Sequence, residues 1–177
     1  MKHLQSDRAF ETGAIDVVLH VGAPKAGTSA IQRFCCAHRV DLERLGFFYP
    51  EHALDPNGVS GGHALMSSAL IRGEADVARS YFQGWLDEAQ DRRLTLLLSA
   101  EAFYGKHQAL QELTQGLNVR VVGFLRNPAD ALVANHNQGI KRHMSVSRLS
   151  DMVERVQRQS VSHLVGRPLC DWADHFG

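Results

Sequence analysis

A short apolar run, followed at once by a glycine-containing loop and the start of a helical pattern, most constrains how this chain can fold. Residues 16–29 read DVVLHVGAPKAGTS. The β-branched residues of 17–21 predict a buried strand, and residues 22–27 interrupt it. A helix that begins after such a loop presents unpaired N–H groups and the positive end of its dipole. The segment therefore predicts a cradle for a phosphate group.

The lysine of this loop stands at an unusual place for a nucleotide-binding loop. In the common pattern G-x-x-x-x-G-K-[ST], the lysine directly follows the second glycine. Here Gly22 and Gly27 have the required spacing, but Thr28 follows Gly27 and the lysine lies inside the loop as Lys25. The displaced lysine argues against an ordinary ATPase or GTPase. A P-loop kinase or NTPase remains an alternative enzyme class.

The loop resembles that of a known family. A hydrophobic strand followed by P-K-x-G-[ST]-[ST] is similar to the 5′-phosphosulfate loop of the sulfotransferases, above all of their bacterial and carbohydrate-type branch. These enzymes take the sulfuryl group from 3′-phosphoadenosine 5′-phosphosulfate (PAPS) and need no metal. The resemblance implies a catalytic role for Lys25 at the bridging oxygen. It implies donor binding by Pro24, Lys25, Ala26, Gly27, Thr28 and Ser29.

A second part of the resemblance lies around Arg126. The family places an arginine after a strand, a serine eight residues later and often a glutamine four beyond, and these side chains hold the 3′-phosphate. Arg126 and Gln138 match, whereas Ala134 stands at the serine position. Asn135, Asn137 or a helix N-terminal amide could supply the missing hydrogen bond. Because of Ala134, a catalytically impaired sulfotransferase-like binding protein remains a further alternative.

Two side chains are candidates for the base that takes the proton of the acceptor. Glu101 follows an apolar run and resembles the S-[SA]-E segment of bacterial family members. His63 follows two glycines, and some glycan sulfotransferases use a histidine in a glycine-flanked loop. A glutamate at a binding edge can have its pKa tuned for base chemistry, but it can also serve only a helix dipole. Both candidates stay open.

Apolar runs and helical patterns alternate along the chain. This order predicts an α/β class, a three-layer P-loop-type fold with a mainly parallel central sheet flanked by helices. Lys25, Glu101 and Arg126 each follow a predicted strand, so they should meet at one sheet edge. The predicted strands are 17–21, 46–50, 94–98 and 119–125. The predicted helices are 29–45, 63–71, 74–90, 102–117, 129–142, 149–156 and 169–176.

Composition and charge exclude several classes of protein. The 177 residues predict a flexible arm over 1–15 and a single domain over 16–177. Lys plus Arg equals Asp plus Glu at 19 each, which gives no basic surface for nucleic acid. Three cysteines make neither a disulfide framework nor a zinc site. No apolar run suits a signal peptide or a membrane span, so a cytoplasmic protein without a membrane partner is expected.

The last residues continue the resemblance. Residues 169–177, LCDWADHFG, are similar to the L-x-x-W-x-x-x-F-G helix end of the family, after which a further strand follows in full-length members. The expectation is a C-terminally incomplete domain, whose open sheet edge would permit a homo-oligomer. The family implies sulfuryl transfer to a hydroxyl or amine of a small-molecule or glycan acceptor.

Overall fold

A computed structural model gives the structure of the chain and describes residues 15–54, 61–158 and 167–176. The arm predicted over 1–15 lies, except for its last residue, outside the described residues. In the described part of the chain, no helix combines the length and the apolar character that crossing a bilayer requires.

The centre of the fold is a four-stranded, all-parallel sheet in the order β2-β3-β1-β4. The sequence-based prediction of an α/β fold with a mainly parallel sheet is therefore confirmed. In the register, Leu19 lies opposite Leu98 on one side and Val121 on the other. The strands are β1 Val17–Val21, β2 Phe47–Phe48, β3 Thr95–Ala100 and β4 Val119–Val122.

Burial explains why these apolar runs form central strands. Val17, Leu19 and Val21 of β1 are fully buried, and so are Leu96 and Leu98 of β3. Strands of a parallel sheet that are covered on both faces have continuous apolar runs rather than alternation. The continuous apolar residues of β1 therefore suit a central strand. Because β1 is central, the loop that follows it lies at the middle of the sheet edge.

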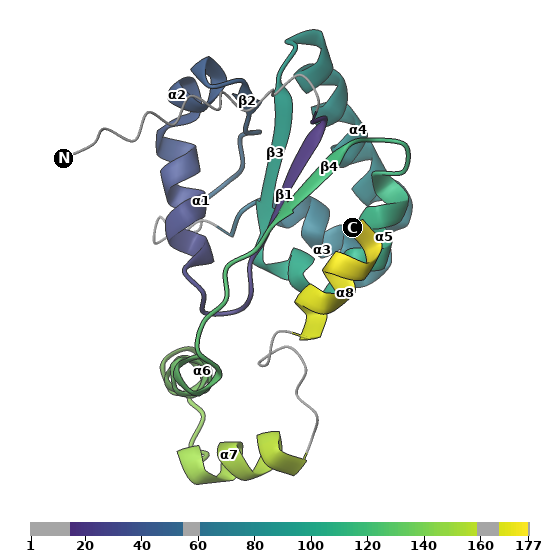
Figure 1. Cartoon of the computed structure of the whole chain (residues 1–177). Helices are drawn as coiled ribbons and strands as arrows, with labels where there is room; N and C mark the ends of the chain where they lie inside the picture. The colour runs from purple at the N-terminus through teal and green to yellow at the C-terminus, as the bar shows by residue number, and fades with distance from the viewer. Residues whose placement is uncertain (1–14, 55–60, 159–166, 177) are drawn as a thin grey trace, which may run out of the picture.

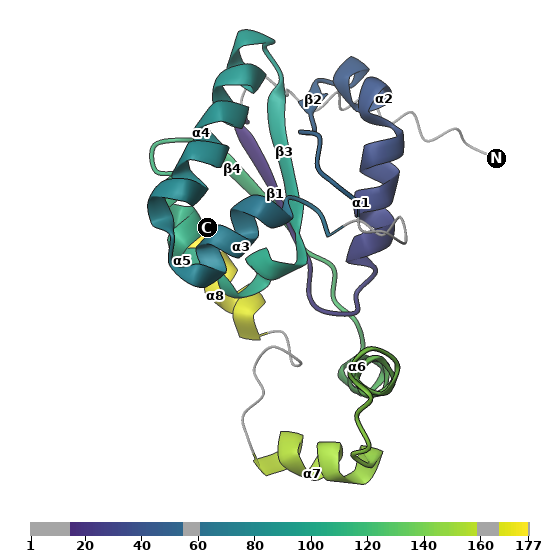
Figure 2. The same cartoon turned by 180° about the vertical axis from the view of Figure 1, so that it is seen from behind.

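Helices cover both faces of the sheet (Figures 1 and 2). One face carries α1 and α2, the other carries α3, α4, α5 and α8, and α6 and α7 lie beyond the carboxyl ends of the strands. The helices are α1 Thr28–Ala37, α2 Arg39–Arg44, α3 Ala64–Arg72, α4 Ala75–Asp91, α5 His107–Leu113, α6 Pro128–His143, α7 Leu149–Arg158 and α8 Arg167–Phe176, with a 3₁₀ helix, η2, over Glu101–Gly105.

The helix predicted over 29–45 is two helices, α1 and α2. The break is at His38, whose backbone leaves the helical region at φ −114° and ψ 28°. The His38 ring packs on the ring of Phe34, with centroids 4.4 Å apart, and its Nδ1 lies 3.3 Å from Asp41. These local contacts compete with helix continuation. The apolar residues Phe34 and Val40 of this segment are exposed rather than part of the core.

Three further boundaries differ from the prediction. The third strand continues to Ala100, because it pairs with β1 as far as Val21. The fourth ends at Val122 instead of 125, because Val122 already lies opposite His20 and β1 has almost ended. The helix predicted over 102–117 is η2 followed by α5, with Lys106 between them in a non-helical conformation.

Trp172 attaches α8 to the rest of the core. Its side chain is only 2% exposed, and the indole N–H donates to the carbonyl of Tyr104 at 2.9 Å. The ring also stacks on Phe176, with centroids 5.2 Å apart. A large aromatic ring with a satisfied polar tip contributes strongly to a core.

We predict that Trp172→Ala lowers the free energy of unfolding by about 3–5 kcal/mol, because it leaves a cavity and an unpaired carbonyl. Urea unfolding followed by circular dichroism measures this loss. Phe34→Ala is the control, since Phe34 is 58% exposed, and its loss should be about 0.5 kcal/mol. Similar losses in the two variants would contradict the core position of Trp172.

Candidate functional site: the loop after β1 and the adjoining cleft

The loop between β1 and α1 is held in a tight conformation. Gly27 precedes α1 at φ 89°, and Lys25 also has a positive φ of 64°. The Ala26 N–H donates to the Ala23 carbonyl at 3.1 Å, which closes a turn. A side chain at Gly22 would collide with that of Thr28. The loop backbone therefore lies directly against the first turn of α1.

The first turn of α1 has the features of an anion site. No acidic residue lies in this turn, and no side chain caps it. Thr28 is 3% exposed, and its buried Oγ1 has no hydrogen-bond partner among the described residues. Ser29 is exposed beside it. Helix N–H groups, an uncompensated dipole and an unpartnered hydroxyl together favour a bound anion.

Arg126 lies directly beside this loop. Its Nη1 donates to the main-chain carbonyl of Lys25 at 3.0 Å, across 101 positions of sequence. Asn127 then caps α6 by accepting from the Ala129 N–H at 2.9 Å, and Pro128 occupies the first turn. The structure thus brings two of the residues singled out in the sequence, Lys25 and Arg126, to the same place.

A cleft of about 410 Å³ adjoins the loop at the carboxyl edge of the sheet. Pro24 and Lys25 form part of one wall, together with Glu101, the first residue of η2. The facing wall comes from α6, from the connection that follows it, and from α7. The predicted meeting of Lys25 and Glu101 at one edge agrees with this arrangement.

Only some of the residues considered for the 3′-phosphate line the cleft. Gln138 and Asn135 line the cleft. Ala134 is half-buried and does not line it, and Asn137 is exposed. Of the two asparagines considered as substitutes for the missing serine, Asn135 is therefore the better placed.

The two candidate bases lie in contrasting environments. Glu101 is exposed at the cleft and has no hydrogen bond or ion pair with any described residue. His63 is 1% exposed and does not line the cleft. Its Nδ1 lies 2.9 Å from the Ser99 main-chain nitrogen and 3.1 Å from the Ser99 carbonyl oxygen, so the ring is held against the Ser99 backbone. Of the two candidate bases, Glu101 is thus the one that a ligand in the cleft can reach.

Burial explains the electrostatics of His63. Aromatic rings surround the imidazole, with centroids at 4.9 Å for Tyr49, 5.0 Å for His52 and 5.1 Å for Trp85. Burial, and after it the neighbouring His52, lowers the pKa of His63 to about 3. A base with so low a pKa stays neutral and holds protons weakly at neutral pH.

Sequence reasoning did not single out two other residues near the site. His20 is buried near the end of β1, and its Nδ1 lies 2.7 Å from the Ser99 hydroxyl. Burial lowers the pKa of His20. Its only sequence signal is a lone polar residue within an apolar strand. Arg155 lines the cleft from α7, three residues after the buried Met152, a spacing that places both on one helix face.

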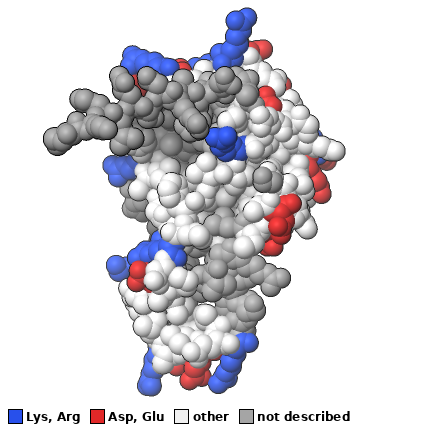
Figure 3. Space-filling model, viewed as in Figure 1, with Lys and Arg blue, Asp and Glu red and all other residues white. Residues whose placement is uncertain are grey.

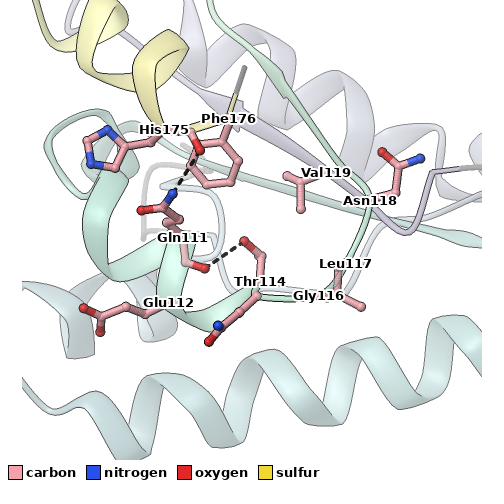
Figure 4. A pocket seen from close by; sticks show the side chains of 10 residues that line it. Gln111, Glu112, Thr114, Gly116, Leu117, Asn118, Val119, His175 and Phe176 are labelled. Atoms are coloured by element: carbon pink, nitrogen blue, oxygen red, sulfur yellow. Dashed lines mark hydrogen bonds between the residues drawn. The ribbon is translucent and has the colours of Figure 1, made fainter.

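A larger cavity, of about 570 Å³, lies at the amino end of β4, away from these residues (Figure 4). Gln111 Nε2 donates there to the carbonyl of His175 at 3.0 Å. The described lining includes Glu112 and no lysine or arginine, so it does not suit a phosphate. Among the described residues, no three His, Cys, Asp or Glu side chains gather in a group that could hold a metal ion.

No protein-family model, curated protein or solved structure matches this chain.

We predict that the protein loses about 2 kcal/mol of stability between pH 7 and pH 5 through His63. The unfolded histidine takes up a proton near pH 6.5, whereas the folded one does so only near pH 3. Stability is thus fully present above about pH 6.5 and falls as the pH drops toward 3. Burial also lowers the pKa values of His20 and His52, which act in the same direction.

Urea unfolding at several pH values measures this slope. His63→Asn should flatten it, and His38→Asn, a change at an exposed histidine, should leave it unchanged. An equally steep slope in His63→Asn and in the unaltered protein would contradict the assignment.

Proposed function

We propose that this protein is a PAPS-dependent sulfotransferase that moves a sulfuryl group to a hydroxyl, or an amine, of a carbohydrate-like acceptor. The observation that carries the proposal is the hydrogen bond from Arg126 to the Lys25 carbonyl at 3.0 Å. It joins a lysine-containing loop before a helix to a second cation, which lies in the connection between β4 and α6. A donor with phosphate groups at two positions needs two such anchors.

The loop after β1 suits the 5′-phosphosulfate end of the donor. Lys25 lines the cleft, and the backbone N–H groups at the start of α1 have no acidic side chain near them in the first turn. The hydroxyls of Thr28 and Ser29 add donors at the same turn, and that of Thr28 has no partner among the described residues. These groups would bind oxygens of the phosphosulfate.

Arg126 suits the 3′-phosphate. Its guanidinium is exposed, and a planar fork of N–H donors matches phosphate oxygens. Ala134 offers no hydrogen bond; Asn135 and Gln138 line the cleft, and Arg126 does not. One lost bond to a charged group costs about 1.5–3 kcal/mol. The donor should therefore bind less tightly than it would if residue 134 were a serine.

In the proposed reaction, Lys25 and Glu101 each have one role. An acceptor oxygen forms a bond to sulfur while the bond from sulfur to the bridging phosphate oxygen breaks. The Glu101 carboxylate takes the acceptor proton, and the Lys25 ammonium neutralises the charge that develops on the leaving bisphosphate. Both side chains line the same cleft, which supports this division.

Ala134 favours a second candidate function, a sulfotransferase-like binding protein that holds the bisphosphate without turnover. A P-loop kinase or NTPase is disfavoured, because Thr28 rather than lysine follows Gly27. Ligand preference distinguishes the sulfotransferase, the binding protein and the P-loop enzyme.

We predict that 3′-phosphoadenosine 5′-phosphate binds more tightly than ATP with magnesium in calorimetric titrations. Lys25→Ala and Arg126→Ala should each weaken bisphosphate binding by roughly tenfold or more, because each removes a charged donor to a phosphate. Lys106→Ala is a matched control, since Lys106 lies after η2 and does not line the cleft.

Tighter binding of ATP with magnesium would contradict the proposal and favour the kinase. Bisphosphate binding without transfer of labelled sulfate from PAPS to a panel of sugars would favour the binding protein.

A further inference from the structure

The wall of the cleft that faces Lys25 carries positive and polar groups that the proposed reaction leaves unused. His136 and His143 line the cleft from α6, and Arg155 lines it from α7. Figure 3 shows Lys and Arg side chains, with Asp or Glu side chains beside them, where the body meets the lower part of the molecule and again at its lower end. These groups belong to the part of the molecule beyond the carboxyl ends of the strands (Figure 1).

Arg155 lacks the partner that its neighbours have. Arg158, on the same helix, pairs with Glu154 at 3.1 Å. The Asp151 carboxylate accepts from the Arg148 N–H and the Ser150 hydroxyl, both at 3.2 Å. The Arg155 side chain makes no ion pair or hydrogen bond with any residue that the structure describes. An exposed residue with an unpaired guanidinium therefore lines the cleft.

Packing fixes the position of the helix that carries Arg155. Met152 is the buried residue of α7, and Arg155 follows it by three positions on the same face. α7 in turn contacts α6, which begins at a capped first turn beside Arg126. The packing of Met152 thus places α7, and with it the Arg155 backbone, at the cleft, and the exposed Arg155 side chain has no partner there among the described residues.

The charges of the proposed site divide between two ligands. Lys25 and Arg126 serve the donor, and Arg126 does not line the cleft. Glu101 is assigned to the acceptor proton. Its single negative charge does not neutralise the two positive charges of Arg155 and Lys25, which line the same cleft. The facing wall therefore favours an acceptor that brings its own negative charge. A guanidinium binds carboxylate or sulfate oxygens through two parallel bonds.

We propose that the α6–α7 wall of the cleft binds an anionic group of the acceptor through Arg155, with His136 and His143 as further donors, so that the acceptor is an acidic carbohydrate. That the bound sugar is the acceptor rests on the proposed function. The anion site itself depends only on these three residues. The anion is a carboxylate of a uronic acid or a sulfate already on the sugar.

The test compares sugars that differ only in the group at C6, which is neutral in one and anionic in two. Methyl glucoside, methyl glucuronide and methyl glucoside 6-sulfate are titrated into the protein, with and without 3′-phosphoadenosine 5′-phosphate, and followed by NMR chemical shifts. At least one acidic sugar should bind about tenfold more tightly than the neutral one. The stronger of the two identifies the anion as carboxylate or sulfate.

Arg155→Ala should abolish this preference, and Arg158→Ala, a matched change on the same helix, should retain it. Equal affinity for the three sugars, including no binding of any, would overturn the inference, as would an equal effect of the two substitutions. The bisphosphate titration tests the donor site separately. A protein that prefers the acidic sugar but does not bind the bisphosphate would contradict the proposed function and leave the anion site standing.

Discussion

The pairing of β1 with β3 on one side and β4 on the other is the constraint on which the site depends. All three strands are parallel, so their carboxyl ends meet at one edge. The register places Val21 opposite Ala100, the residue before Glu101, and His20 opposite Val122, four residues before Arg126. A shift of this register would separate the groups that the proposed chemistry needs.

The loop after β1 has a further tie that does not depend on strand pairing. Lys25 has a left-handed backbone conformation, which costs a non-glycine residue about 1–3 kcal/mol. The Arg126 hydrogen bond to the Lys25 carbonyl and the packing of Thr28 on Gly22 help to hold the loop in this shape. The second predicted phosphate anchor thus also positions the first. Binding at the two anchors should be coupled for this reason.

The central strands and the positions of Lys25, Glu101 and Arg126 could be predicted from the sequence, because continuous apolar runs and the polar residues that end them are local signals. The end of β4 could not, since it depends on where β1 stops. The break at His38 arises from its contacts with Phe34 and Asp41. The burial of His63 depends on Ser99, 36 positions away.

Site-resolved NMR with 3′-phosphoadenosine 5′-phosphate tests the central claim most directly, namely that the loop after β1 and Arg126 form one anion-binding site. We predict that the largest shifts of backbone amides occur at residues 25–29, with a shift of the Arg126 guanidinium at the same ligand concentration. Unchanged amides at 25–29, with shifts confined to the cavity at residues 111–119, would contradict the account.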